Sequence, residues 1–230
     1  MNPGFFMLNL PKSTEYGKRI PKTKFYQNLN LSNKVKQQFV DEIDTIIWQN
    51  KISPDTVGIS AGENVSEIEL IEIRLHQKGI RKNILEIIDK EIPYHLVFVL
   101  TFEDRAQIAV GYKEKIKKKD DKYKVEGYYF SEWAFPDELS VELKGLNLDR
   151  IYENLVRQHI PEERPQLKTL KGTIDLQKEI EKQIAFCESL EKKVRSEKQF
   201  NVQVRLNREL REERMKLEDM LAEKDSVGKN

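Results

Sequence analysis

Lysines and tyrosines concentrate in one short segment of the chain, residues 113–124, and directly after it. The segment holds seven lysines against three acidic residues. Lysines neutralise phosphates and tyrosines stack on exposed bases, so this composition is typical of a nucleic-acid contact. The candidate residues are Lys113, Lys115, Lys117, Lys118, Lys119, Lys122, Lys124 and Tyr128. A solvated hairpin tip, whose charges discourage edge pairing while the tyrosines face the core, explains the same pattern, and both interpretations stay open.

A second set of candidate residues consists of carboxylate side chains. Pro54 and Asp55 precede a stretch that contains Glu67, Glu69 and Glu72. Nucleases of the PD…ExK type hold Mg²⁺ between an Asp and a Glu on adjacent strands and place a Lys two residues after the Glu. Arg74 stands at that place after Glu72, and an arginine stays protonated and is a poor base. A salt-bridged strand surface is therefore the favoured interpretation, and a metal-dependent nuclease is kept as an alternative.

Residues that would indicate other enzyme classes do not assemble in the sequence. Its one cysteine, Cys187, has no histidine in a triad-like context, the three histidines are scattered, and no glycine-rich phosphate loop occurs. We therefore expect no catalytic residues, no metal site and no cofactor, and we favour a protein that is not an enzyme.

The overall composition excludes several classes. The 230 residues are 34% charged and 38% hydrophobic with a net charge of +1, so only a local charge asymmetry can attract a polyanion. The apolar run 96–100 is far shorter than the roughly 18 residues that a membrane span needs. A single cysteine fits a reducing compartment, where we expect it to pack inside a helical region. These features predict a cytoplasmic protein with no membrane segment.

Hydrophobic periodicity predicts the elements that must position these side chains. Spacing of three and four predicts helices at 32–49, 81–90 and 146–159. Alternation predicts a strand at 66–75, and short β-rich runs bounded by turn residues predict strands at 56–60, 95–102, 107–115 and 123–130. The alternation in 66–75 changes phase at Leu70 and Ile71, which predicts a bulge or a strong twist there. The elements together predict an α+β fold: a mostly antiparallel sheet of about five strands with flanking helices, in a domain spanning 1–160.

The remainder of the chain reads as a linker, 161–172, and a helical tail, 173–226. The apolar stripe of the tail changes face, which predicts either a bend or helical hairpin near 196–201 or a coiled-coil helix contacted on two sides. Two apolar faces offer more surface than one packing partner covers, so the tail is the predicted partner-binding region, with intramolecular packing as the alternative. The candidate residues are Leu190, Val194, Phe200, Asn201, Val204, Leu206, Leu210 and Leu217.

Several stretches resemble an uncharacterised bacterial family, the domain of unknown function 4391 (DUF4391). They are KRIPKTKFY at 18–26, IIWQNKISPDTVGI at 46–59, EIPYHLVFVL at 91–100, LDRIYENLVRQH at 148–159 and LEKKVRSEKQFNVQVRLNREL at 190–210. The resemblance implies an α+β protein with a helical C-terminus, encoded beside DNA methyltransferases and helicase-like proteins. It further implies an accessory or adaptor subunit of a bacterial DNA-targeting or phage-defence assembly. We expect such a neighbour, or a second copy of the tail, as the partner; nucleic-acid binding through 113–124 is the alternative.

Overall fold

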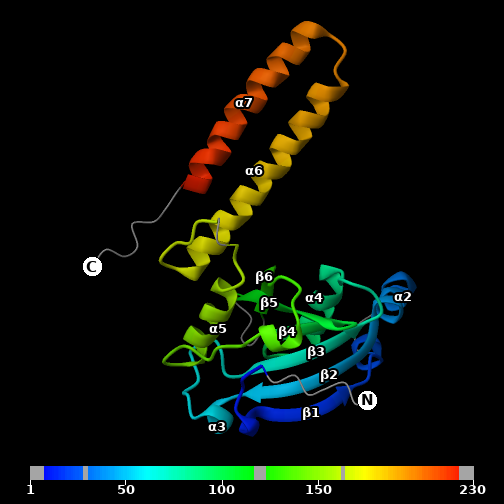
Figure 1. Ribbon diagram of the computed structural model, residues 1–230, viewed down its shortest axis with the longest axis vertical. Coiled ribbons are helices and arrows are strands. Elements are labelled where there is room, and N and C mark those ends of the chain that lie inside the picture. The colour runs from blue at the N-terminus through cyan, green and yellow to red at the C-terminus, as the bar shows by residue number, and fades with distance from the viewer. Residues whose placement is uncertain (1–7, 28–30, 117–122, 162–163, 223–230) are drawn as a thin grey trace. The chain divides into compact units, whose positions relative to one another are not determined.

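The computed structural model describes residues 8–27, 31–116, 123–161 and 164–222 (Figure 1). The chain forms two compact units, residues 1–160 and residues 161–230. The first unit contains the sheet and the second contains two long helices. Each unit is described by itself below.

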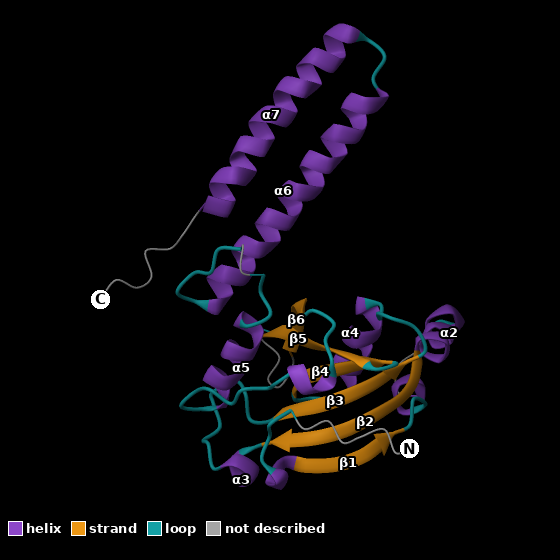
Figure 2. Cartoon of the chain, viewed as in Figure 1, coloured by secondary structure: helices purple, strands orange, loops and turns teal. Residues whose placement is uncertain are grey.

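A six-stranded sheet forms the first unit, and its strands lie side by side in chain order (Figure 2). Neighbouring strands run antiparallel except β3 and β4, which are parallel and joined through helix α4. This confirms the predicted α+β fold with a mostly antiparallel sheet. The strands are β1 (Glu15–Ile20), β2 (Ile43–Ile52), β3 (Ile68–Leu75), β4 (His95–Phe102), β5 (Arg105–Lys115) and β6 (Tyr123–Phe130).

Helices α2 (Asn33–Glu42) and α4 (Lys82–Glu91) pack on one face of the sheet. Phe39 of α2 and Ile84 and Ile88 of α4 are buried against Ile73 of β3 and Phe98 of β4. The alternate residues of the central strands point to the other face and are buried too, among them Leu70, Val97 and Val99. Burial on both faces explains why β4 is almost continuously apolar.

Helix α5 (Leu148–Arg157) begins at Asn147, whose side chain accepts a hydrogen bond from the Arg150 N–H at 3.0 Å. Its predicted apolar stripe is buried, and the Tyr152 hydroxyl donates to the backbone oxygen of Gly111 on β5.

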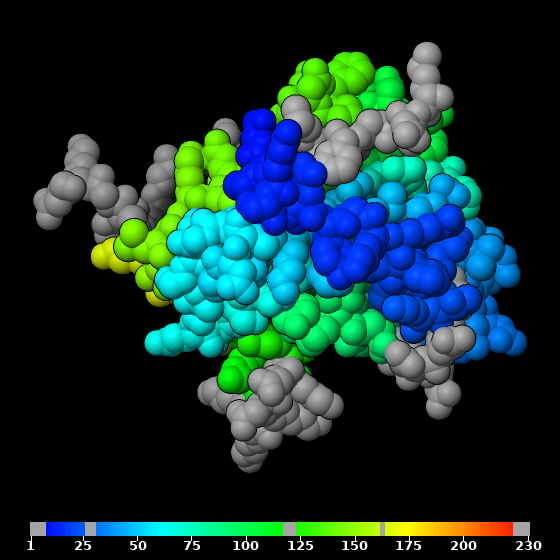
Figure 3. Space-filling model, turned by 90° about the horizontal axis from the view of Figure 1, so that it is seen from below, coloured from blue at the N-terminus to red at the C-terminus, as the bar shows by residue number. Residues whose placement is uncertain are grey.

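The shorter helical elements are η1 (Lys12–Thr14), α1 (Lys24–Gln27), α3 (Pro54–Val57) and η2 (Pro136–Glu138). Figure 3 shows the N-terminal segment, in dark blue, beside the cyan residues of the α3 region. The Ser13 hydroxyl donates to the Thr56 backbone oxygen at 2.6 Å, which links the two.

The predicted helix at 32–49 is wrong after residue 42. Helix α2 ends there and the chain continues directly as β2, which pairs with β1 and β3. The isoleucines at 43, 46 and 47 fit a helical spacing as well as a strand, and β-branched side chains favour the strand once neighbours on both sides supply hydrogen bonds.

The predicted strand at 56–60 is wrong as well. Residues 54–57 form the single helical turn α3, in which the Thr56 hydroxyl accepts from the Ser53 backbone N–H at 2.9 Å. The turn ends at Gly58, whose φ of 68° lies in the left-handed region that glycine adopts without strain. Pro54 at the start of the turn is typical of a helix N-terminus.

The phase change predicted at Leu70 and Ile71 coincides with an irregularity in the sheet, although the extra residue lies on the neighbouring strand. Trp48 of β2 pairs with Ile71 and Asn50 pairs with Leu70, which leaves Gln49 as the inserted residue. The bulge therefore changes the direction of the β2 side chains opposite the middle of β3.

The second unit contains α6 (Leu170–Ser196) and α7 (Phe200–Ala222), which pack against each other as a helical hairpin. The reversal at 197–199 falls inside the predicted range of 196–201. Helix α6 begins at Thr169, whose side chain accepts a hydrogen bond from the Gly172 N–H at 3.1 Å. Within the described ranges, no helix combines the length and the apolar character needed to cross a bilayer.

Candidate functional site

The two helices of the hairpin meet along an apolar seam. Cys187 and Leu190 of α6 are buried with Leu210 of α7, and Val194 and Leu206 pack against them half-buried. Four of the predicted partner-binding residues, Leu190, Val194, Leu206 and Leu210, therefore hold the hairpin together. The apolar stripe changes face along the tail because the chain reverses between the helices, so that both stripes point into the same seam.

Polar side chains continue the seam between the two helices. The Gln183 amide on α6 donates to the Glu213 carboxylate on α7 at 2.7 Å, and Arg214 of α7 forms an ion pair with Glu191 of α6. Near the reversal, the Gln203 amide donates to the Val194 backbone oxygen at 3.1 Å. These contacts fix one register of the two helices, so the residues on the outer face of α7 occupy defined positions.

A second group of apolar side chains on α7 points away from the seam. Phe200, Val204 and Met215 are 75%, 52% and 59% exposed, whereas Leu210 is 7% exposed. At about 100° per residue, these three side chains fall within about 60° of one another and about 80–140° from Leu210. We call Phe200, Val204 and Met215 the outer stripe of α7.

The other predicted tail residues divide between the two surfaces. Asn201 is exposed beside Phe200, and Leu217 is half-buried at an angle that matches the seam. Met215 was missed by the sequence analysis because one methionine among charged residues gives no periodic signal. Its alignment with Val204 follows once the seam fixes the rotation of α7.

The basic segment of the first unit lies only partly within the described residues. Lys115, at the end of β5, and Lys124, at the start of β6, are exposed, and Lys124 pairs with Glu126 at 2.9 Å. Lys117, Lys118, Lys119 and Lys122 lie outside the described residues. Lys113 and Tyr128 are 9% and 6% exposed, so these two side chains are not at the surface to contact a phosphate or a base.

Lys113 and Tyr128 instead meet one buried carboxylate. The Lys113 ammonium lies 2.6 Å from Oδ1 of Asp89 on α4, and the Tyr128 hydroxyl donates to Oδ2. The ammonium also donates to the Tyr94 backbone oxygen. Burial raises the pKa of Asp89, against the attraction of Lys113, and burial lowers the pKa of Lys113. Buried pairs with opposed shifts occur at functional sites and in structural ion pairs alike. Each buried charge is matched by a partner within the fold, so we interpret the pair as structural.

The acidic strand does not assemble the predicted nuclease site. Glu69 and Glu72 are three residues apart on β3 and so point to opposite faces of the sheet. Glu72 accepts from Arg74 at 2.7 Å, and Asp55 is exposed on α3. Among the described residues, no group of three or more histidine, cysteine, aspartate or glutamate side chains is arranged to hold a metal ion.

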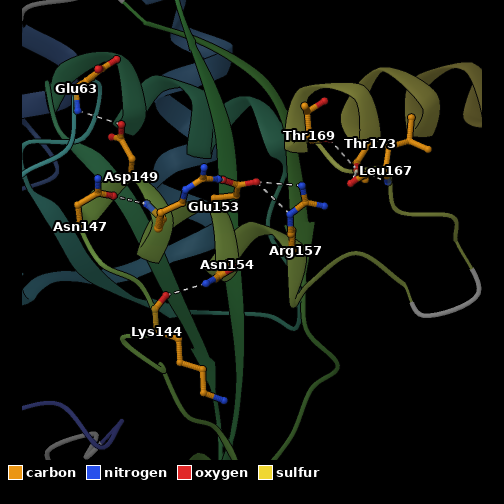
Figure 4. Close-up of polar contacts among 11 residues, drawn as sticks. Glu63, Lys144, Asn147, Asp149, Glu153, Asn154, Arg157, Leu167, Thr169 and Thr173 are labelled. Atoms are coloured by element: carbon orange, nitrogen blue, oxygen red, sulfur yellow. Dashed lines mark hydrogen bonds and ion pairs between the residues drawn. The ribbon is translucent and has the colours of Figure 1, made fainter. Parts of the chain in front are cut away.

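Asp149 connects α5 to the loop that precedes β3, as Figure 4 shows. Its carboxylate accepts hydrogen bonds from the backbone N–H groups of Glu63 at 3.0 Å, Asn64 at 3.2 Å and Val65 at 2.7 Å. All three donors are backbone groups of one loop, so the carboxylate fixes the path of the chain into β3. This contact is structural, and sequence reasoning missed it because 84 residues separate Asp149 from Val65.

Comparison with known proteins identifies one family. The family model described as "Domain of unknown function (DUF4391)" matches residues 8–217, and the chain belongs to this family. No curated protein and no solved structure matches the chain. The matched residues extend into both units.

Proposed function

We propose that this DUF4391 protein is a non-catalytic adaptor that docks onto a partner protein through the outer stripe of α7. The observation that carries the proposal is the exposure of Phe200, Val204 and Met215 on one side of a hairpin whose seam is already closed by other residues. A helix that buries one apolar face and exposes a second has an unpaired surface, and aromatic and methionine side chains are enriched where proteins meet.

Charged residues beside the outer stripe indicate which partner surface fits it. On the helical wheel Arg211 falls within the arc of the stripe and Arg208 about 20° beyond Met215, and both are exposed. Arg208 contacts Glu212 at 3.2 Å on its own helix, an exposed pair of small energetic value that a partner carboxylate can replace. The complementary surface is therefore an apolar groove with acidic residues at its rim.

The resemblance to the family supports a partner that acts on DNA. The resemblance implies genes encoded beside DNA methyltransferases and helicase-like proteins, so the partner that we propose is a subunit of a bacterial DNA-targeting or defence complex. The alternative occupant of the stripe is a second copy of the same hairpin.

Co-purification of the full chain with the products of its neighbouring genes tests the proposal. Val204→Asp with Met215→Asp places two charges in the outer stripe and should abolish co-purification while the helical circular dichroism stays the same. Lys182→Gln with Lys192→Gln on α6 is the matched control, because it makes the same change in net charge at exposed positions outside the stripe. If both double variants co-purify equally with the partner, the outer stripe is not the docking surface. Sedimentation of the protein alone distinguishes the second occupant, since a dimer that the first double variant dissociates indicates self-association.

Nucleic-acid binding is the second candidate function, and the exposure of Lys115 and Lys124 at the ends of β5 and β6 supports it. Oligonucleotide binding at low salt should weaken when Lys117, Lys118, Lys119 and Lys122 become glutamate. Lys113 stays unchanged in this experiment because its buried contact with Asp89 supports the fold. Identical binding of the variant and the wild type would exclude this function for the segment.

A further inference from the structure

A cavity of about 280 Å³ opens in the first unit where β2 and β3 meet α1 and the end of α4. Aromatic side chains line it, namely Phe25, Trp48 and Tyr94, together with aliphatic residues and three charged residues, Lys24, Glu69 and Glu91. Its volume is near the lower end of the range for small-molecule sites, about 300–1,000 Å³. Lys24 is exposed and Glu91 half-exposed, whereas Glu69 is fully buried. The carboxyl group of Glu69 is therefore the deepest charge-bearing group of the lining.

Glu69 has one carboxyl oxygen with a donor and one without. Oε2 accepts a hydrogen bond from the Trp48 indole N–H at 2.6 Å. Within the described part of the chain, no donor reaches Oε1 of Glu69 or Oε2 of Glu67, and both atoms are buried. The other oxygen of Glu67 contacts the Lys51 ammonium at 2.9 Å. A buried carboxyl oxygen without a donor is costly, and here it belongs to a residue that lines a cavity.

The charges around Glu69 determine its protonation state. Burial, followed by the adjacent Glu67, raises the pKa of Glu69 to about 8, against the Trp48 hydrogen bond and the Lys51 charge. Below about pH 8 the Glu69 carboxyl group therefore holds a proton. Lys51 is already paired with Glu67, so a cation that enters the cavity can take the place of the proton on Glu69.

The chemistry of the walls decides between an organic cation and a metal ion. Trp48, Phe25 and Tyr94 present aromatic surfaces, and aromatic faces attract ammonium groups, with tryptophan the strongest. Divalent metal ions need several oxygen ligands, and among the described residues no cluster of three or more metal-binding side chains occurs. An aliphatic chain also matches the apolar part of the lining, which a hydrated metal ion would leave unpaired.

We propose that this cavity binds a small aliphatic amine, with its ammonium group paired to Glu69 and its carbon chain packed against Trp48 and Phe25. The site lies in the first unit and is independent of the docking surface on α7. The ammonium group replaces the proton on Glu69, so the amine enters as a cation and one proton leaves to solvent.

Isothermal titration of the full-length protein with butane-1,4-diamine tests the proposal, with butan-1-ol and MgCl₂ as comparison ligands. We expect saturable binding of the diamine and no binding of the alcohol. Glu69→Gln should weaken diamine binding at least tenfold while it keeps an acceptor for the Trp48 indole. Glu132→Gln removes one exposed negative charge outside the lining and should leave binding unchanged. Absence of diamine binding, equal binding of the alcohol, preferential binding of Mg²⁺, or full binding by Glu69→Gln would each overturn the proposal.

Proton release separates binding at Glu69 from a nonspecific charge effect. At pH 7, titrations in two buffers of different ionisation enthalpy should report close to one proton released per diamine bound, because Glu69 is protonated below its pKa of about 8. Affinity should rise up to about tenfold per pH unit between pH 6 and 8. A further variant, Ile20→Phe, enlarges a lining side chain without changing the carboxyl groups, and it should also weaken diamine binding. Binding without proton release, or unaffected by the filled cavity, places the amine elsewhere.

Discussion

The carboxylate of Asp149 occupies the space that a β-carbon at position 62 would need. Gly62 therefore permits the close approach through which Asp149 accepts hydrogen bonds from three consecutive backbone N–H groups. Asp149 also lies in the first turn of α5, where a negative charge is favourable at the positive end of the helix dipole. One small residue and one carboxylate thus fix the entry of the chain into β3, the strand that carries Glu69.

Replacing either residue should loosen the same loop. Asp149→Ala leaves the three backbone donors without their acceptor, and we expect a loss of about 1–3 kcal/mol in the free energy of unfolding, measured with urea. Gly62→Ala forces the Asp149 carboxylate away, and we expect a similar loss in the free energy of unfolding. Because both changes disrupt one contact, the double variant should lose less than the sum of the two. Asp104→Ala, at an exposed carboxylate, is the control and should be nearly neutral. Additive losses would show that the two residues do not act through one contact.

The buried pair of Lys113 and Asp89 should be more important for stability than any exposed ion pair of the first unit. Lys113→Met leaves the Asp89 carboxylate buried without its cation, and such a break typically costs about 3–5 kcal/mol. Adding Asp89→Asn should restore part of the loss, because the amide carries no charge. Lys115→Met, two residues away at an exposed position, should change the urea midpoint little. A loss of equal size for Lys113→Met and Lys115→Met would contradict the buried pair.

His95 should make the protein less stable in acid. Burial, with the nearby Lys113 charge, lowers the pKa of His95 to about 3, so the folded protein keeps the imidazole neutral while the unfolded chain binds a proton below about pH 6.5. The stability that depends on neutral His95 is therefore lost as the pH falls from about 6.5 towards 3. Relative to His95→Gln, the wild type should lose about 2 kcal/mol between pH 7 and 5 in urea unfolding. The imidazole resonances of His95 should show no titration above pH 5, and a midpoint near 6.5 would refute its burial as a neutral group.

Patterns in short stretches of sequence predicted the elements whose structure depends on neighbouring residues. The β4–β5 hairpin consists of two runs of strand-forming residues joined by a short turn, and α5 has Asn147 as a cap, so both follow from neighbouring residues. The change at residue 42 from α2 to β2 could not be predicted in this way, because the isoleucines that follow it fit either period. The flanking strands, which lie far away in the sequence, decide in favour of β2.

The side-chain partners depend on contacts that no short segment of sequence contains. Lys113 looks like a surface lysine because its neighbours are lysines, and only the approach of α4 gives it Asp89 as a partner. The tail is different, since a stripe that changes face predicted a helical hairpin as one of the alternatives. The same pattern could not tell the seam from the outer stripe, because both consist of apolar residues at helical spacing.

The seam and the outer stripe of the hairpin should respond in opposite ways to truncation. Leu210 is buried between the helices, so Leu210→Ala removes packing atoms and should destabilise the hairpin by about 2–4 kcal/mol. Met215 is 59% exposed on the same helix, so Met215→Ala should change the free energy of unfolding by less than about 0.5 kcal/mol. Hydrogen exchange of the α7 amides measures the two effects directly, with protection lost in Leu210→Ala and kept in Met215→Ala. Partner capture at a temperature where both variants are folded should show the reverse order, because Met215 belongs to the proposed docking surface and Leu210 does not. Loss of protection in Met215→Ala would mean that the outer stripe is covered within the protein itself, and the docking surface would then have to lie elsewhere.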